Sequence, residues 1–387
     1  MGKLRGFLKM ALFGLACAAL GYGLALFLRV PPAFDLSQIE FPRAVREEQG
    51  MPVVQVFFAT NRALLPGSVP PAFTDGCAKE MVYGVAGVRI PETYTVVDVQ
   101  RPDTPRGEID PERARILEIQ AMGEAEFSKR LRGAAAAGAG VERPLLFVHG
   151  IQNSLDSALR QAGTLAFSLN LPQPMVCFGW PTDPSLSAAA YRRSQEQVAD
   201  ASLALAEFVE SQLPTRFDIL AHSLGCKVVC KAMEALSGEA GEGVPEGAAP
   251  IGNVVLAAPD VDRGDFQGAF AAPVSSSSGR ATVYVARNDS ALVLSSFLNG
   301  GARAGSGLDP MAVVEGIYDE DAGDAARVEI VDATFVNSAL TSHGYFYQSR
   351  AALADLHNLL RNDLPACQRQ LLRHERAKHS NYWVIPP

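Results

Sequence analysis

The sequence predicts an α/β fold: a mostly parallel sheet with helices on both faces. Short apolar runs alternate with helix-forming segments from residue 144 onward, and such an alternation is typical of parallel strands joined by helices. The first of these runs, residues 144–148, is apolar at every position after its proline, as expected for a strand buried on both faces. The 387 residues, 48% of them hydrophobic, suffice for one large domain or two modest ones.

Two strands are predicted before that alternation begins. Residues 52–59 are rich in β-branched and aromatic side chains and favour a strand, and residues 82–91 favour a second one. Residues 100–142 are charged and then rich in alanine and glycine, which indicates a helix followed by a loop.

The regular part follows in order. Its predicted strands are residues 144–148, 174–178, 216–221, 253–258, 281–286 and, last, 327–332. Its predicted helices are residues 156–168, 187–212, 224–236 and 350–360. The segments 237–251 and 271–280 are rich in glycine, alanine or serine and are predicted to be loops.

The first thirty residues differ from the rest of the chain. Lys3, Arg5 and Lys9 precede an uncharged apolar stretch, residues 10–28, which is long enough to span a bilayer as one helix. Because the basic residues come first, we expect a single-pass anchor in the cytoplasmic (inner) membrane of a bacterium, with the following domain on the outer, periplasmic side. A signal peptide cleaved near residues 16–18, followed by export, is the alternative.

The predicted domain organisation follows from these segments. Residues 1–30 form the anchor or signal peptide, 31–50 a linker, 51–362 the α/β domain and 363–387 a C-terminal tail.

Composition excludes several classes of function. The net charge is −8 and no dense lysine or arginine stripe occurs, which argues against a nucleic-acid partner. Cys226 and Cys230 lie one helical turn apart and are expected to pack as small apolar groups. Neither a metal-ligand spacing nor a glycine-rich phosphate loop is present, so we expect no metal and no organic cofactor.

Residues 217–226 are the most informative stretch. An apolar run ends in Ala-His-Ser-Leu-Gly and a helix-forming sequence follows, which indicates a strand, a tight turn and a helix. In such a turn Ser223 adopts a strained conformation that exposes its hydroxyl, and the flanking Ala221 and Gly225 must be small. The alternative interpretation is that Ser223 is an ordinary helix N-cap.

A nucleophilic serine needs a base and an acid that orients the base. Asp289 directly follows a predicted strand and is the favoured acid, with Asp260 and Asp262 as rivals. His343 follows the strand predicted at 327–332, which completes the chain order Ser, Asp, His. The other histidines lie within a helix, in the tail or beside other motif residues: His357, His374, His379, His149 and His222.

The oxyanion of such a reaction needs backbone donors. The turn at His149 and Gly150 follows the 144–148 strand, so the N–H of Ile151 can face the site together with that of Leu224. Side chains that could line a pocket there are His149, Asn153, Trp180 and His222. Arg62 could bind a substrate carboxylate or pair with an acidic neighbour.

Together these motifs resemble a bacterial family of esterase- or lipase-like α/β-hydrolases whose members are mostly of unknown function. The motifs cover about residues 50–360 and are the segments 56–62, 149–153, 178–181, 221–225, 258–260, 287–289 and 343–346. The resemblance implies the α/β-hydrolase fold and the triad Ser223, Asp289 and His343, but no substrate. Gln152 stands where the family pattern leads us to expect an aromatic or small apolar residue.

The expected function is therefore that of a serine hydrolase acting on a small-molecule carboxylic ester through a covalent acyl-enzyme. The alternative is a binding protein that keeps the hydrolase scaffold without catalysis, since a fold alone never establishes activity. The sequence leaves the bond type, disulfides and oligomeric state open.

Overall fold

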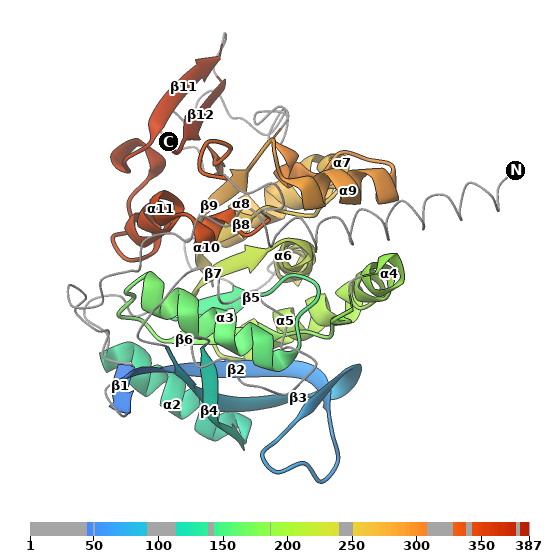
Figure 1. Ribbon diagram of the computed structural model, residues 1–387, viewed down its shortest axis with the longest axis vertical. Helices are drawn as coiled ribbons and strands as arrows, with labels where there is room; N and C mark the ends of the chain where they lie inside the picture. The colour runs from blue at the N-terminus through green and yellow to red at the C-terminus, as the bar shows by residue number, and fades with distance from the viewer. Residues whose placement is uncertain are drawn as a thin grey trace, which may run out of the picture.

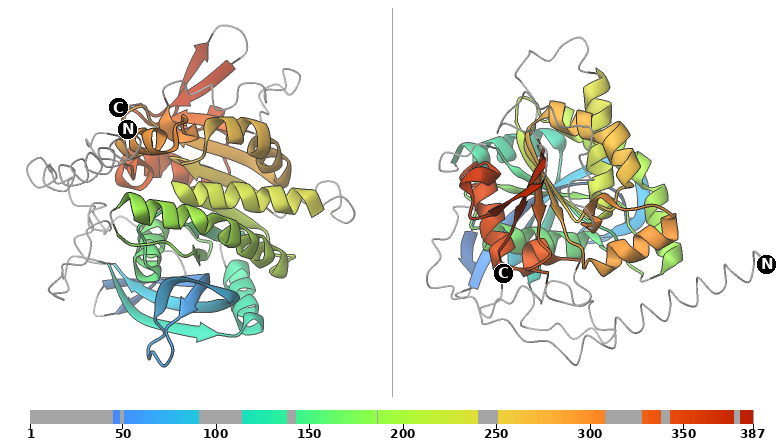
Figure 2. Two further views of the ribbon diagram at one scale, coloured as in Figure 1. Left: turned by 90° about the vertical axis from the view of Figure 1, so that its right-hand side faces the viewer. Right: turned by 90° about the horizontal axis from the view of Figure 1, so that it is seen from above.

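The computed structural model describes residues 45–48, 51–90, 114–137, 143–185, 187–239, 251–307, 328–337, 343–376 and 380–386. They build a 12-stranded sheet with helices on both of its faces (Figure 1; Figure 2). Within these ranges, no helix combines the length and the apolar character that a bilayer span requires. The anchor predicted at residues 10–28 lies outside the described residues.

The central strands of the sheet are all parallel. In spatial order they are β2 (Met51–Leu64), β6 (Met175–Gly179), β5 (Leu145–Val148), β7 (Phe217–His222), β8 (Ile251–Ala257), β9 (Ser278–Val285), β10 (Val328–Asp332) and β12 (Ser380–Val384). Antiparallel strands flank them: β1 (Val45–Glu48), β3 (Phe73–Arg89) and β4 (Arg115–Met122) on one side, and β11 (Leu372–Arg376) on the other. Below, the carboxyl end of the sheet means the end at which the parallel strands finish, and the amino end means the opposite one.

Two apolar cores lie on the two faces of the sheet. Successive residues of β2 alternate between them, so that Phe57 belongs to one core and Phe58 to the other, as the period of a strand requires. The helices α2 (Glu124–Ala137), α5 (Val198–Ser211), α6 (Leu224–Glu239) and α8 (Ala271–Ser277) cover the first face. The helices α3 (Leu155–Ser168) and α11 (Arg350–Leu360) cover the second.

Shorter helices follow the carboxyl ends of the strands. They are α4 (Ala188–Glu196), α7 (Arg263–Asp265) with the π-turn Phe266–Phe270, α9 (Ser290–Asn299), the 3₁₀ turn Ala304–Ser306 and α10 (Tyr345–Gln348). The mostly parallel sheet with covered faces confirms the predicted fold class. It also gathers at one end every loop in which catalytic residues of this architecture are expected.

The structure corrects three predicted elements in the middle of the chain. The helix predicted at 187–212 is two helices, α4 and α5, which meet at Gln197. Part of the segment predicted as helix and loop, 100–142, is the strand β4, which is half exposed and depends on pairing with β3. The loop predicted at 271–280 contains α8 and the start of β9.

The ends of the predicted domain also differ. Within the predicted linker, β1 pairs with β2. The strand at 328–332 is not the last one, because β12 adds to it in parallel, with Val331 opposite Trp383. The sheet therefore extends past the boundary predicted at residue 362 and takes in much of the predicted tail, since β10 would otherwise present an unpaired edge.

Candidate active site

Ser223 lies between β7 and α6 in the left-handed backbone region, with a φ of 55°. Residues other than glycine rarely adopt this conformation, and a strained strand-to-helix turn is typical of a nucleophilic serine. Its N–H donates to the Ala257 carbonyl at 3.0 Å, and its own carbonyl accepts from the Asp260 N–H at 3.1 Å. The strand β8 and the residues after it therefore fix the turn.

The alternative interpretation of Ser223 as a capping residue finds no support in its contacts. Its hydroxyl makes no hydrogen bond to any residue that the structure describes, whereas the cap serines Ser154 and Ser187 accept one from the backbone of their helices. The Ser223 side chain is thus available for chemistry, although the residue is only 3% exposed.

Close backbone contacts explain the small residues around the turn. A Cβ atom added to Gly225 would lie 2.3 Å from the carbonyl oxygen of His149, a distance that real atoms do not tolerate. A Cβ atom on Gly150 would lie 3.0 Å from the Cβ of Ser223. The loop after β5 therefore packs directly against the serine turn. Glycine is required at position 225, and a side chain at position 150 would need its neighbours to shift by a few tenths of an ångström.

Asp289 and His343 form a hydrogen-bonded pair. Asp289 follows β9 and is fully buried, and its Oδ2 lies 2.8 Å from Nδ1 of His343. The other carboxylate oxygen, Oδ1, accepts from the Leu292 N–H at 3.0 Å and caps α9. With both oxygens engaged, the carboxylate holds one orientation and directs Nδ1 of the imidazole toward itself, which leaves Nε2 for a reacting group.

The pair perturbs the titration of His343. Burial lowers the pKa of this imidazole, but the negative charge of Asp289 and the hydrogen bond to it outweigh that effect, and the net pKa is raised above 6.5. Asp260 contributes to the same upward shift. The side chain remains 18% exposed, so a ligand can reach it.

His222 supports the segment that carries His343. Its Nε2 lies 2.9 Å from the backbone carbonyl of His343, and its ring packs against the rings of His343 and Phe346. Burial first, and then the neighbouring His343, hold the pKa of His222 well below 6.5. A neutral His222 donates from Nε2 to that carbonyl, so the residue next to the serine also positions the histidine.

The two rival acids have other partners. The carboxylate of Asp260 accepts from the hydroxyls of Tyr191 at 2.8 Å and Ser295 at 2.5 Å. Asp262 caps α7 through the Gly264 N–H and pairs with Arg303. Neither is bonded to His343, which leaves Asp289 as the acid that contacts the imidazole in the described structure.

The loop after β5 lies beside the serine turn because β5 and β7 are neighbours in the sheet. Leu224 is the first residue of α6, and the first N–H groups of a helix have no acceptor inside it. Ile151 lies in the facing loop, where the side-chain amide of Asn153 donates to the carbonyls of Gly150 and Ile151 at 3.2 and 2.9 Å. The loop is thus tied back on itself beside Ser223.

Two residues predicted to line a pocket do not do so. His149 and Trp180 have no exposed surface. Their rings stack at 5.7 Å, and Trp180 Nε1 donates to the His149 carbonyl at 2.7 Å. Both residues pack in the core beneath the loop after β5 and stabilise it. An indole and an imidazole at the ends of buried strands fill the core more readily than they face solvent.

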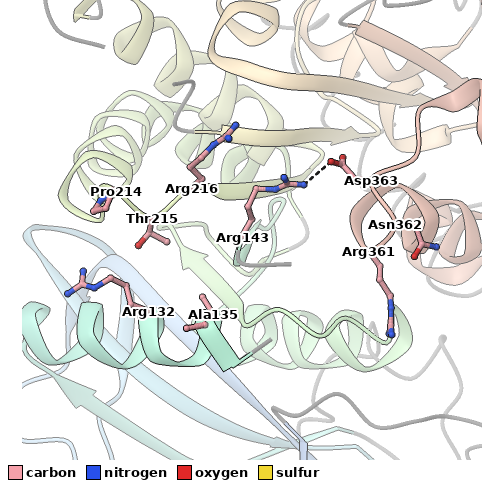
Figure 3. Close-up of a pocket in the computed structure, with 10 residues that line it drawn as sticks. Arg132, Ala135, Arg143, Pro214, Thr215, Arg216, Arg361, Asn362 and Asp363 are labelled. Carbon is pink, nitrogen blue, oxygen red and sulfur yellow. Dashed lines mark ion pairs between the residues drawn. The ribbon is translucent and has the colours of Figure 1, made fainter. Parts of the chain in front are cut away.

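No cluster of three or more metal-ligating side chains occurs among the residues that the structure describes. A cavity of about 730 Å³ lies at the amino end of the sheet, far from Ser223 along β7, and Figure 3 shows its lining. Its charged lining residues are Arg132, Arg143, Arg216, Arg361 and Asp363. This cavity contains none of the residues predicted for catalysis.

The family comparison agrees with the fold. The family described as alpha/beta hydrolase of unknown function (DUF900) matches residues 124–367. The crystal structure of Aspergillus fumigatus lipase B is similar with a TM-score of 0.34 and 14% identity, over 70% of this chain and 66% of that one, just under two thirds of the lipase. No curated protein matches the sequence. Because the family match spans more than half of the 387 residues, the chain belongs to this family of α/β hydrolases of unknown function.

Proposed function

We propose that this chain is a serine hydrolase of carboxylic esters with Ser223 as nucleophile, His343 as base and Asp289 as orienting acid. The observation that carries the proposal is the 2.8 Å bond between His343 Nδ1 and the buried Asp289, next to a serine in a strained strand-to-helix turn. A buried carboxylate that fixes an imidazole beside a strained serine is the arrangement that acyl transfer requires.

The reaction follows from these positions. His343 Nε2 takes the hydroxyl proton as Ser223 Oγ attacks the ester carbonyl, and Asp289 stabilises the imidazolium that forms. The N–H groups of Leu224 and Ile151 bind the oxyanion, with the positive end of the α6 dipole behind them. The protonated His343 then gives its proton to the leaving alcohol. Water repeats the sequence on the acyl-enzyme and releases the carboxylic acid.

Substrate binding must bring Ser223 Oγ and His343 Nε2 within hydrogen-bond distance. In the part of the chain that the structure describes, no hydrogen bond joins Ser223 Oγ to His343 Nε2, and such bonds commonly tighten only in the substrate complex. The bond from His222 to the His343 backbone keeps the two catalytic segments in contact meanwhile.

A fluorophosphonate probe tests the proposal. The purified full-length protein should be labelled and should hydrolyse p-nitrophenyl butyrate, and Ser223→Ala should abolish both. Ser154→Ala, which removes a cap serine on a helix outside the triad, is the control and should keep both. A folded protein whose Ser223 stays unlabelled would instead support a non-catalytic scaffold that binds a partner.

We further propose that residues 10–28 anchor the enzyme in the cytoplasmic membrane with its domain on the outer side, as the preceding basic residues favour. A fusion of alkaline phosphatase after residue 50 should be active, because that reporter works only after export. An inactive but stable fusion would refute the orientation. Release of a shortened chain from the membrane would instead support signal cleavage.

A further inference from the structure

Arg62 is a buried cation without a carboxylate partner. The residue is 2% exposed, and no carboxylate within the described ranges lies at ion-pair distance from it. Its Nε has no hydrogen-bond partner there either. Burying an unpaired charge is costly, so its placement calls for an explanation other than stability.

The strand that carries Arg62 is irregular at this point. The register between β2 and β3 shifts on both sides of the pair Arg62 and Cys77. Such irregularities redirect side chains and are frequent next to active sites. The Arg62 N–H bonds to the hydroxyl of Thr60 at 3.1 Å, and that hydroxyl donates to the Gly179 carbonyl of β6. The backbone therefore holds Arg62 firmly at the carboxyl end of β2.

Within the described ranges, the guanidinium binds neutral oxygens only. Its Nη1 donates to the Thr74 carbonyl of β3 at 3.4 Å. Its Nη2 donates to the carbonyl of Asn153 at 2.6 Å and to the hydroxyl of Thr182 at 3.3 Å. Thr182 donates to the same Asn153 carbonyl at 2.7 Å and accepts from the Asn153 N–H at 3.2 Å. Three segments that are far apart in sequence thus meet on the backbone of Asn153.

Asn153 transmits this contact to the expected oxyanion donor. Its side-chain amide holds the carbonyls of Gly150 and Ile151, while Gln152, which lies between Ile151 and Asn153, has a φ of 62°. A left-handed glutamine is strained and persists only when its surroundings hold it. The bonds from Arg62 and Thr182 to Asn153 supply that restraint.

The positive charge of Arg62 also affects the pKa of His149 in the loop after β5. Burial lowers the pKa of Arg62 to about 10, so the side chain stays protonated at neutral pH. Burial and then the positive charge of Arg62 lower the pKa of His149 to about 3. A fixed cation in a water-poor environment favours negative charge that develops nearby.

We propose that Arg62 is a positioning residue of the oxyanion loop: through Asn153 it holds residues 149–153 so that the Ile151 N–H faces the developing oxyanion. The inference rests on the proposed function and deepens it. It replaces both roles that the sequence suggested for Arg62. The charges of Asp75 and Asp156 act on the guanidinium, but no carboxylate of the described ranges lies at ion-pair distance, and the residue is buried rather than open to a pocket.

Arg62→Met in the full-length protein is the main test. Methionine has a similar apolar length, and replacing a buried charge by an apolar group of similar volume is often neutral for stability. We expect kcat for p-nitrophenyl butyrate to fall about 10²-fold, as for a displaced catalytic group, with KM within about threefold and no fall in the unfolding midpoint. Arg62→Lys, which keeps the charge but has a single donor nitrogen in place of the planar guanidinium, should recover part of the rate.

Arg369→Met is the matched control. Arg369 is also buried, at 5% exposure, but it bonds Glu329 at 2.8 Å and pairs with Asp355 at 3.4 Å, far from Ser223 in the fold. Its loss removes the cation beside the buried Asp355 and leaves Glu329 with only the longer pair to Arg280 at 3.8 Å, which should lower the unfolding midpoint while kcat per folded molecule stays unchanged. If Arg62→Met behaves like Arg369→Met, Arg62 is a structural residue and the inference is wrong.

A double-mutant cycle tests whether Arg62 acts through Asn153. Asn153→Ala alone should lower kcat, and Arg62→Met combined with it should be no slower than the slower single variant, because both changes interrupt one chain of bonds. Rate losses that multiply would overturn the proposed route.

Hydrogen exchange separates this inference from the proposed function. In Arg62→Met, amide exchange in residues 149–153 should accelerate about tenfold or more, while α11 is unchanged. This measurement needs no activity. An unlabelled wild-type protein would refute the hydrolase, whereas unchanged exchange in the loop would refute the role of Arg62 in either case.

Discussion

The two ends of the parallel sheet place different residue types in the left-handed backbone region. At the carboxyl end, Ser223, Gln152 and Ala258 have φ values of 55°, 62° and 50°. At the amino end, Asn170 and Asp363 have values of 44° and 52°. Asparagine and aspartate tolerate this region because their short polar side chains bond locally, whereas serine, glutamine and alanine gain no such compensation.

This difference locates backbone strain at one end of the molecule. Each left-handed residue other than glycine, asparagine or aspartate costs on the order of 1–2 kcal/mol. At the amino end the chain turns with residues suited to turning, beside the arginine-lined cavity in Figure 3. At the carboxyl end the chain contains strained left-handed residues, because the turns there must bring particular backbone and side-chain groups together. Strain thus marks the candidate site without reference to any catalytic motif.

The strongest test of the comparison is Ser223→Gly. Turnover should fall on the order of 10⁶-fold, because the nucleophile is lost. The free energy of unfolding should be unchanged or higher by up to about 1 kcal/mol, because glycine adopts the left-handed region without strain. Ester hydrolysis and urea unfolding measure the two effects. Clear destabilisation would mean that Ser223 is not strained.

Asp289→Asn should have the next largest effect. The loss in kcat should be about 10⁴-fold, since an amide favours the wrong imidazole tautomer. Stability should change little, because asparagine still offers an oxygen to cap α9 through Leu292. Asp262→Asn is the control at the same end of the sheet and should stay within about twofold of the wild-type rate. The reverse order of effects would assign the acid to Asp262.

The pH profile gives a smaller, graded effect. His343 must be neutral to accept the serine proton, and its pKa is raised above 6.5, so kcat/KM should fall as pH drops through a value above 6.5. In Asp289→Asn the residual activity should show this limb at lower pH. The stabilisation from the charged pair should be complete below the unfolded pKa of about 6.5 and lost as pH rises through the folded value. An acid limb that Asp289→Asn leaves in place would contradict the assignment.

The smallest effects compare one residue from each end. Ala258→Gly should raise the free energy of unfolding by up to about 1 kcal/mol, because it removes strain at the carboxyl end. Asn170→Gly at the amino end should change it by only a few tenths of a kcal/mol, because asparagine is already tolerated there. Thermal unfolding of the two variants under identical conditions measures the difference. Equal shifts would remove the contrast between the two ends.

Sequence reasoning succeeded where one local pattern decides the structure. The strands β5, β6 and β7 are short, wholly buried runs, and their bounds differ from the prediction by about one residue. Sequence reasoning failed where a strand forms only because a neighbouring strand pairs with it. The strand β4 is half exposed and exists because β3 offers it a partner, and β12 depends on β10 in the same way.

The candidate site likewise contains residues that the sequence could predict and contacts that it could not. Ser223, Asp289 and His343 could be chosen from residue type and chain order, because each follows a recognisable strand. The contacts of Arg62 with Asn153 and Thr182 could not be chosen, because no sequence spacing relates three separate elements. The engagement of Asp260 by Tyr191 and Ser295 was equally hidden, although it bears directly on the choice of acid.

The sequence by itself determined the fold class, the strained serine turn and the chain order of the proposed catalytic residues, because these depend on local periodicity and on small residues at fixed spacing. Only the tertiary structure decided which acid meets His343 and what Arg62 binds. Both contacts depend on distances between side chains that the packing of the sheet brings together. The role of a buried charge such as Arg62 can be inferred only from the atoms that surround it.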